Sequence, residues 1–272
     1  MLKLPDSEHL LAAALDACRV AGVIHREHFR SAGLTADEID KKADASPVTQ
    51  ADRGSEAAIR EALRRATPDL GLLGEEYGQE GDERDRWVID PLDATRNFVA
   101  GLPWFATLIG LELDGELVLG VVHAALLDAT WCAVRGGGAW AGSGTDPAVC
   151  RERRLRVSET ATVEDAFVQH GGLVHFQHSG LWPAFSDLVA RAGRTRGFGD
   201  WWGHMLVAEG RCDAMLEGVV HYHDVAAIKP ILEEAGGVFL TRGGAPLGRG
   251  FKGPTLSSNR NLAGALAGVL GF

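Results

Sequence analysis

Five carboxylates in this sequence stand where an apolar segment meets a turn or a helix. They are Asp52, Glu75, Asp90, Asp93 and Asp224. Any one acidic residue at such a junction is usually a helix cap or a solvated loop residue. If several of them converge, however, they raise one another's pKa unless a cation neutralises them. Oxygen ligands select hard ions such as Mg²⁺ or Mn²⁺ rather than Zn²⁺, so convergence would create a site for a hard divalent cation.

The segment 90–98 suggests how such a site would bind a phosphate. Pro91 stiffens the turn, so that Asp90 and Asp93 can point to the same side. If a short helix begins near Ala94, its first amides and its positive dipole end face whatever the carboxylates hold. Cations on one side and N–H donors on the other would bind a phosphoryl group. The D-x-x-D spacing differs from the D-x-D of phosphatases with an aspartyl nucleophile, so we expect direct attack by water.

The elements that position these side chains are predicted from apolar periodicity and turn signals. Helices are expected at 10–29, 53–65, 181–191, 201–209, 224–235 and 261–270. Segment 105–134 is typical of an antiparallel meander with a hairpin turn at Asp114-Gly115. The best boundary is 142–147, rich in glycine and polar residues. We therefore expect an N-terminal α+β domain (1–145) with most metal ligands, and a C-terminal α/β domain (146–272) with Asp224 and the substrate pocket.

Composition excludes several classes of function. The 272 residues include 27 Lys and Arg against 37 Asp and Glu, a formal net charge of −10. This balance argues against a nucleic-acid or membrane-surface partner. The four cysteines are scattered, which indicates neither a zinc site nor a disulfide framework and favours the cytoplasm. With acidic residues near the start and no long apolar run, we expect a soluble protein without a signal peptide.

At these carboxylates the sequence resembles the inositol monophosphatase family of magnesium-dependent, lithium-sensitive phosphomonoesterases. The family motifs T-x-x-D, G-E-E, D-P-[IL]-D-G-T-x-N-F, W-D-x-A-A and E-A-G-G match residues 49–52, 74–76, 90–98, 223–227 and 234–237 in order. The resemblance covers nearly the whole chain. It implies a mixed α/β fold, a layered αβαβα sandwich that is usually a homodimer. It also implies two or three Mg²⁺ per site, with Mn²⁺ as an alternative, and a small phosphorylated metabolite as substrate.

The resemblance also implies a role for individual residues. The implied metal ligands are Glu75, Asp90, the backbone carbonyl of Leu92, Asp93 and Asp224. Asp52 and Thr95 together would orient the attacking water, with Glu75 counted among the catalytic residues. Ala94 and Thr95 would contact the phosphate, and Lys42 would help to close the site.

Three positions depart from the family pattern. Ala94 replaces a glycine, and its Cβ would crowd the phosphate and, at positive φ, cost roughly 1 kcal/mol or more. Pro230 lies inside the expected helix after Asp224, where we expect a kink. His223 replaces a tryptophan. We expect His221 and His223 to line or cap the pocket rather than bind metal, since no third nitrogen or sulfur ligand is suitably spaced.

Within the family, four segments match the histidinol-phosphatase branch: 46–52, 73–78, 199–202 and 207–210. Histidinol phosphate carries an ammonium and an imidazole, which pocket carboxylates would bind through charge-assisted hydrogen bonds. Asp200 and Glu217 fall at the family's substrate-recognising positions. Asp200 could instead be a helix N-cap, and Glu217 a solvated loop residue.

The leading hypothesis is therefore Mg²⁺-dependent hydrolysis of histidinol phosphate to histidinol, a step of histidine biosynthesis. Inositol 1-phosphate, another polyol phosphate or a nucleotide 3′-phosphate are alternative substrates. A hypothesis of another class is a non-catalytic dimeric relative, with Ala94 as evidence of decay. Retention of all the acidic residues and Thr95 argues against decay, since a decaying site has no reason to keep the whole set.

Overall fold

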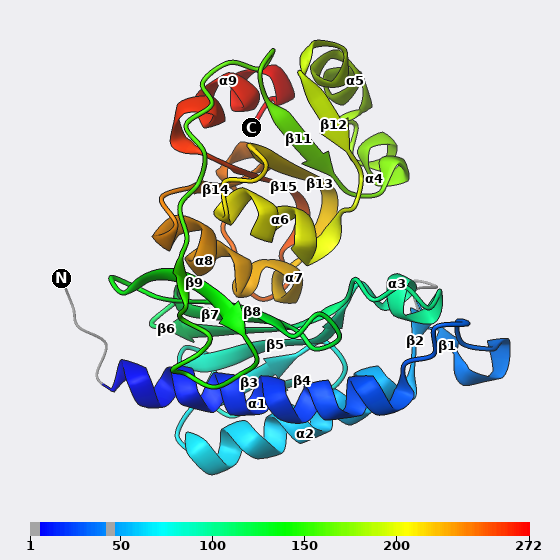
Figure 1. The fold of residues 1–272 in the computed structure, drawn as a ribbon, viewed down its shortest axis with the longest axis vertical. Helices are drawn as coiled ribbons and strands as arrows, with labels where there is room; N and C mark the ends of the chain where they lie inside the picture. Colours follow the sequence, from blue (N-terminus) through cyan, green and yellow to red (C-terminus); the bar gives the residue numbers. More distant parts are fainter. Residues whose placement is uncertain (1–5, 42–46) are drawn as a thin grey trace.

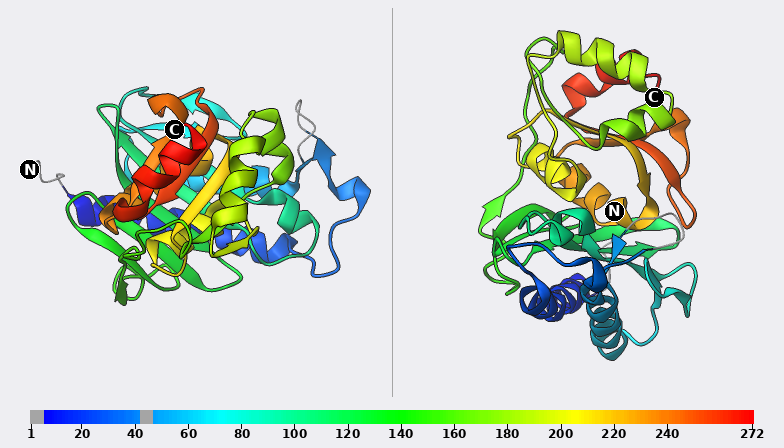
Figure 2. Two further views of the ribbon diagram at one scale, coloured as in Figure 1. Left: turned by 90° about the horizontal axis from the view of Figure 1, so that it is seen from above. Right: turned by 90° about the vertical axis from the view of Figure 1, so that its right-hand side faces the viewer.

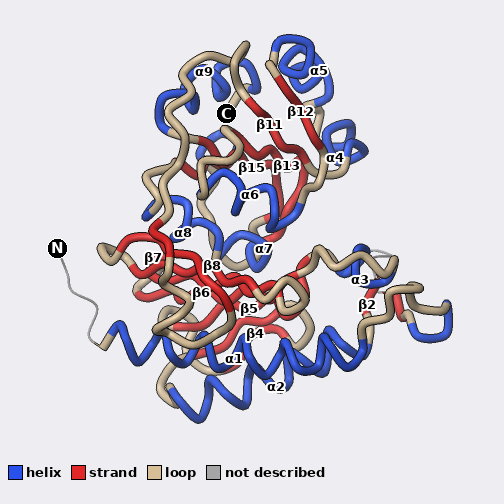
Figure 3. Tube along the Cα trace, in the orientation of Figure 1, coloured by secondary structure: helices blue, strands red, loops and turns tan. Residues whose placement is uncertain are grey.

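The computed structural model describes residues 6–41 and 47–272, and in it helices and sheets alternate in five layers (Figures 1 and 3). The first layer is α1 (Ser7–His28) and α2 (Gln50–Ala66), which pack along one another under an eight-stranded sheet. A middle layer of α6 (Asp200–Ala208), α7 (Tyr222–Ala226) and α8 (Ile228–Glu234) separates this sheet from a five-stranded one. The outermost layer is α4 (Leu173–His178), α5 (Trp182–Arg191) and α9 (Arg260–Leu270) (Figure 2). The predicted layered α/β fold is confirmed.

The eight-stranded sheet has the order β10-β9-β8-β7-β6-β5-β3-β4. Its strands are β3 (Gly71–Gly74), β4 (Gly78–Glu80), β5 (Arg86–Asp93), β6 (Ala106–Leu113), β7 (Glu116–Ala124), β8 (Ala129–Val134), β9 (Gly138–Ser143) and β10 (Arg153–Arg154). Strands β6 to β8 form the meander predicted over 105–134, and β9 continues it by antiparallel pairing with β8. Asp114 and Gly115 both have positive φ, 51° and 79°, as the expected tight hairpin turn requires.

The five-stranded sheet has the order β12-β11-β13-β15-β14, with β11 parallel to β12 and β13. Its strands are β11 (Phe167–His170), β12 (Arg194–Arg196), β13 (Ala214–His221), β14 (Val238–Thr241) and β15 (Lys252–Ser258). A small ribbon, β1 (Asp40–Lys41) with β2 (Pro47–Val48), lies beside α3 (Thr95–Val99). The chain changes sheet between β10 and β11, and the predicted division at 145/146 stays a prediction.

Local signals explain the two long helices. In α1 the residues Leu11, Ala14, Leu15, Cys18 and Ala21 recur at helical spacing and are all buried. Helix α2 begins at Gln50 rather than at 53, because Thr49 is its N-cap and forms a capping box. Among residues 6–41 and 47–272, no helix has both the length and the apolar character that crossing a bilayer requires.

The expected helix at 224–235 is divided into α7 and α8, which meet at Ala227. Pro230 lies in the first turn of α8, where its missing N–H breaks the hydrogen-bond ladder back to α7. The α7–α8 junction packs directly on β6 and β7, where glycines leave room for it. A Cβ on Gly120 would lie 2.0 Å from the carbonyl oxygen of Ala227, and one on Gly110 would lie 2.8 Å from Ala226. This contact fixes the height of α7 above the first sheet.

Candidate active site

The candidate site lies where β5 ends beneath α7. The pairing of β5 with β6 shifts register between Asp90 and Asp93, and Pro91, which has no N–H to donate, stands in this gap. Asp90 is buried, and its Oδ1 accepts a hydrogen bond of 3.1 Å from the amide of Leu92. The irregularity therefore turns the two aspartates out of an otherwise apolar strand.

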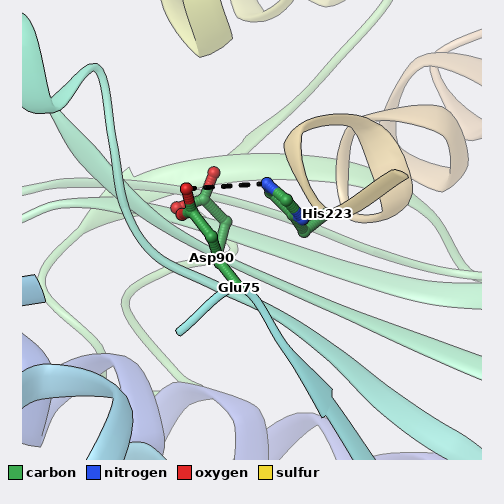
Figure 4. A group of neighbouring side chains, drawn as sticks. All are labelled: Glu75, Asp90 and His223. Atoms are coloured by element: carbon green, nitrogen blue, oxygen red, sulfur yellow. Dashed lines mark ion pairs between the residues drawn. The ribbon is translucent and has the colours of Figure 1, made fainter. Parts of the chain in front are cut away.

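Four acidic side chains, hereafter the carboxylate cluster, meet at this point from three segments. They are Glu75, Asp90, Asp93 and Asp224. Glu75 comes from the turn between β3 and β4, and Asp224 is the third residue of α7. Ligand atoms of Glu75, Asp90 and His223 all lie within 4.8 Å of one another (Figure 4). The structure thus brings together the predicted carboxylates, and it adds a histidine that sequence reasoning assigned only to the pocket wall.

Asp93 connects the end of β5 to the start of α6. Its Oδ1 accepts a hydrogen bond of 2.8 Å from the amide of Ala94, and its Oδ2 accepts one of 2.9 Å from the amide of Trp201. Burial raises the pKa of Asp93 well above its ordinary value, and the nearby charges of Asp200 and Asp224 raise it further. The carboxyl groups are thus close enough to repel one another.

The burial of Asp93 among other carboxylates makes the site fit a cation. A carboxylate whose pKa is raised by burial, and further by neighbouring carboxylates, is stabilised when a divalent ion supplies the missing positive charge. The donors are mainly carboxylate oxygens, which suit hard divalent ions. The carbonyl oxygen of Leu92 lies at the same bend, 3.0 Å from the Oγ1 of Thr95.

Asp52 and Thr95 form a hydrogen-bonded pair beside the cluster. Thr49 holds the Oδ2 of Asp52 through its amide and its hydroxyl, both at 2.7 Å. The Oγ1 of Thr95 donates to the Oδ1 of Asp52 at 2.9 Å. Burial raises the pKa of Asp52 although these hydrogen bonds oppose the shift. Lys42, the remaining residue expected near this side, lies outside the described residues.

Sequence reasoning missed the group that holds the turn carrying Glu75. The buried carboxylate of Glu56 in α2 accepts hydrogen bonds from the amides of Glu76 at 2.6 Å and Tyr77 at 3.2 Å. Arg60, one turn further along α2, donates to the Oε1 of Glu56 at 2.8 Å. Glu56 therefore fixes the backbone on which Glu75 stands.

A cavity of about 380 Å³ opens beside the carboxylate cluster, between α3, α4, α6, β13 and α7. Its wall includes Asp93, Arg96, Asn97, His175, Phe198, Asp200, Trp201, His204, Glu217 and Asp224. The cavity is large enough for a small metabolite and is continuous with the metal-ligand candidates. Polar and charged residues form much of its wall, as a charged ester would require.

Asp200 and Glu217 meet inside this cavity. Asp200 is the first residue of α6 and Gly199 is the N-cap, so the alternative of Asp200 as the cap is wrong. Glu217 is buried within β13, so the alternative of a solvated loop residue is wrong too. The Oε1 of Glu217 accepts a hydrogen bond of 2.9 Å from the amide of Asp200.

Both carboxyl groups have raised pKa values. Burial, with a contribution from Asp224, raises the pKa of Asp200 to about 6, although Arg96 opposes the shift. Burial and then the charge of Asp200 raise the pKa of Glu217 well above its ordinary value. The charged form of either group is therefore unfavourable in the empty pocket, and a cation bound beside the pair would stabilise it.

Known proteins resemble this chain in both sequence and structure. A sequence model of the inositol monophosphatase family matches residues 6–270. A histidinol-phosphatase of Streptomyces coelicolor is 37% identical over 266 residues, 96% of this chain and 94% of the relative. One of Mycobacterium tuberculosis is 42% identical over 200 residues, 73% of this chain and 75% of the relative. A solved inositol monophosphatase from Zymomonas mobilis has a TM-score of 0.83 and 30% identity, over 98% of this chain and 100% of its own.

These similarities span the whole carboxylate cluster as well as both sheets, since the family match begins at residue 6 and ends at residue 270. They confirm the resemblance that the motifs predicted. The relatives named above are phosphoric monoester hydrolases. The chain therefore belongs to the inositol monophosphatase family.

Proposed function

We propose that this phosphoric monoester hydrolase converts histidinol phosphate to histidinol in a Mg²⁺-dependent reaction. The observation that carries the proposal is the pair of buried carboxylates, Asp200 and Glu217, in the cavity beside the carboxylate cluster. The histidinol-phosphatases among the relatives support the same substrate. A homodimer and a cytoplasmic location remain predictions from the resemblance and the cysteine usage.

The charge of the pocket favours a cationic substrate. The raised pKa values of Asp200 and Glu217 indicate that their negative charges are poorly compensated. An ammonium group would be their counterion and would form a charge-assisted hydrogen bond. The hydroxyls of an inositol phosphate would offer hydrogen bonds without positive charge. The same pocket would therefore bind a charged amino alcohol phosphate more tightly than a polyol phosphate.

The carboxylate cluster and the carbonyl of Leu92 would hold Mg²⁺, two or three ions per site, with Mn²⁺ as an alternative. The family is metal-dependent. Such ions neutralise the phosphate and lower the pKa of the attacking water. Glu75 would contribute to catalysis as one of these metal ligands.

Asp52 and Thr95 would orient the water and accept its proton. Because the Thr95 hydroxyl donates to Asp52, its lone pairs can accept a hydrogen bond from a water on the cluster side. A proton passing from that water to Thr95 would release the hydroxyl proton of Thr95 to Asp52. Burial raises the pKa of Asp52 and so favours this acceptance.

The phosphate would rest on the start of α3. The amide of Ala94 is committed to the Oδ1 of Asp93, so contact with the phosphate would begin at Thr95, with Arg96 at the cavity wall. Ala94 has φ 67° and ψ 43°, the left-handed conformation that favours glycine. The strain predicted for positive φ is therefore present, at about 1–2 kcal/mol.

The proposed substrate is tested by phosphate release from histidinol phosphate and from inositol 1-phosphate, each with Mg²⁺ and with excess chelator. We expect kcat/KM to favour histidinol phosphate by roughly tenfold or more, because one charge-assisted hydrogen bond contributes about 1.5–3 kcal/mol. Chelation should abolish both activities. A preference for inositol 1-phosphate would replace the proposed substrate, and full activity in chelator would refute the metal requirement.

Substitution of Asp200 tests the recognition step. Asp200→Asn should raise KM for histidinol phosphate by roughly 10- to 150-fold and leave turnover of inositol 1-phosphate nearly unchanged, since only the first substrate loses a charged contact. Asp187→Asn, on the exposed part of α5, is the matched control and should change neither. Equal losses on both esters would show that Asp200 serves the fold or the metals rather than the ammonium.

The hydroxyl of Thr95 is tested by a pair of substitutions. Thr95→Val keeps the shape of the side chain and removes the proton path, so kcat should fall by roughly 10²–10⁴-fold. Thr95→Ser retains the hydroxyl and should recover most of the rate. Titration calorimetry with Mg²⁺ should show similar affinity in all three proteins. A loss of less than about threefold in the valine variant would exclude the proton-transfer role.

The strain at Ala94 is tested by Ala94→Gly. Glycine adopts positive φ without a steric penalty but loses more entropy on folding, so the free energy of unfolding should rise by about 0.5–1 kcal/mol. Thermal denaturation measures this change, and kcat/KM should stay equal or rise. Ala100→Gly, at φ −78°, is the control and should lower the melting temperature. A large loss of activity in Ala94→Gly would mean that the methyl group helps to shape the phosphate site.

A further inference from the structure

We propose that His223 donates its Nε2 to a divalent cation held by Glu75 and Asp90, so that this metal centre has mixed nitrogen and oxygen ligands. The inference rests on the proposed metal-dependent function and goes beyond it, since the oxygen ligands alone would define a site for a hard ion. It assigns a ligand at the position where this chain departs from the tryptophan of the family motif.

The first support is the position of the imidazole. It projects from α7 toward the carboxylates of Glu75 and Asp90 (Figure 4). The Nε2 lies 3.7 Å from the Oε1 of Glu75 and 3.0 Å from the Oδ1 of Asp224. Two donors about 2.1 Å from one ion, at 90–110° to each other, are about 3.0–3.4 Å apart. The observed distances bracket this range, so one ion could be shared with little movement of the side chains.

The second support is the rigidity of the backbone beneath His223. The amide of His221 donates to the Oδ2 of Asp224 at 2.7 Å, which closes the first turn of α7. Tyr222 is buried on the adjacent side, and Ala226 packs against Gly110 of β6. These contacts hold the imidazole on the cluster side of α7. Its side chain is 22% exposed, so an ion can reach the nitrogen.

The third support is the chemistry of the substitution. A tryptophan indole offers only an N–H donor, whereas a neutral imidazole presents a lone pair that binds metals. A role limited to hydrogen bonding with Asp224 would account for the 3.0 Å contact. The same nitrogen also lies within 4.8 Å of ligand atoms of both Glu75 and Asp90, which is the placement that a shared metal ion requires.

The consequence is a change in metal preference. Imidazole nitrogen binds Mn²⁺, Co²⁺ and Zn²⁺ more readily than Mg²⁺, which prefers oxygen. Loss of the nitrogen should therefore weaken the binding of Mn²⁺ more than the binding of Mg²⁺. For His223→Phe we expect the Mn²⁺ dissociation constant to rise by about tenfold or more. The Mg²⁺ constant should change by less than about threefold, because oxygen ligands dominate its binding.

The experiment uses the full chain loaded with Mn²⁺ alone and reads nitrogen coordination by pulsed electron paramagnetic resonance. Wild type should show a directly coupled ¹⁴N that shifts on labelling with ¹⁵N-histidine, a measurement that needs no variant. His223→Phe and His223→Trp should lose this coupling. His221→Phe is the matched control, because its ring stacks on that of His223 with centroids 5.5 Å apart, and it should keep the coupling.

The outcomes separate the inference from the proposed function. Bound Mn²⁺ without histidine coupling in wild type would overturn the inference and leave a metal-dependent phosphatase with oxygen ligands. Coupling that survives in both His223 variants would overturn it as well, because another histidine would then be the ligand. Failure of wild type to bind Mn²⁺ or Mg²⁺ at all would refute the metal site of the proposed function itself. If the phenylalanine variant does not fold, the labelled wild type and the tryptophan variant still show whether His223 is the nitrogen ligand.

Discussion

The repulsion among carboxylates at the end of β5 is the constraint on which the site depends. Each aspartate of the cluster is held by a backbone amide: Asp90 by that of Leu92, Asp93 by two amides, and Asp224 by that of His221. Fixed N–H dipoles offset part of the negative charge before any ion binds. His223 offsets part of the charge of Asp224. A bound cation would neutralise the charge that remains.

Holding these groups in place requires elements from distant parts of the chain to meet closely. The β5 irregularity at Pro91 supplies two aspartates, and the glycines of β6 and β7 let the α7–α8 junction approach from above. From below, Glu56 anchors the turn that carries Glu75. The apolar core on both faces of the first sheet stabilises the arrangement, so its burial energy offsets the cost of gathering like charges.

What the sequence could predict was local. The meander and α1 follow from patterns within a few residues. The capping box at Thr49 was missed, and α2 was predicted to begin at 53, although Thr49 and Asp52 have the spacing of such a box. The sequence did not indicate β15, because Lys252-Gly253-Pro254 begins it and its buried Thr255 carries no apolar signal. Nor did it identify Glu56, although Asp52, Glu56 and Arg60 follow one another at intervals of four on the buried face of α2. That spacing was the available signal, but it also fits an exposed ion pair, and only tertiary packing distinguishes the two.

His223 shows the same limit at the centre of the site. Spacing along the chain offers His221 and His223 no third nitrogen or sulfur ligand, whereas the fold surrounds His223 with oxygens of Glu75, Asp90 and Asp224. A motif departure in a decaying site would disturb its neighbours without improving any contact. Here Asp52 and Thr95 remain hydrogen-bonded, and the imidazole points into the cluster. The substitution therefore adds a nitrogen ligand to the centre, while the carboxylate cluster and the pair of Asp52 and Thr95 are retained. This combination argues for an altered metal preference rather than for loss of catalysis.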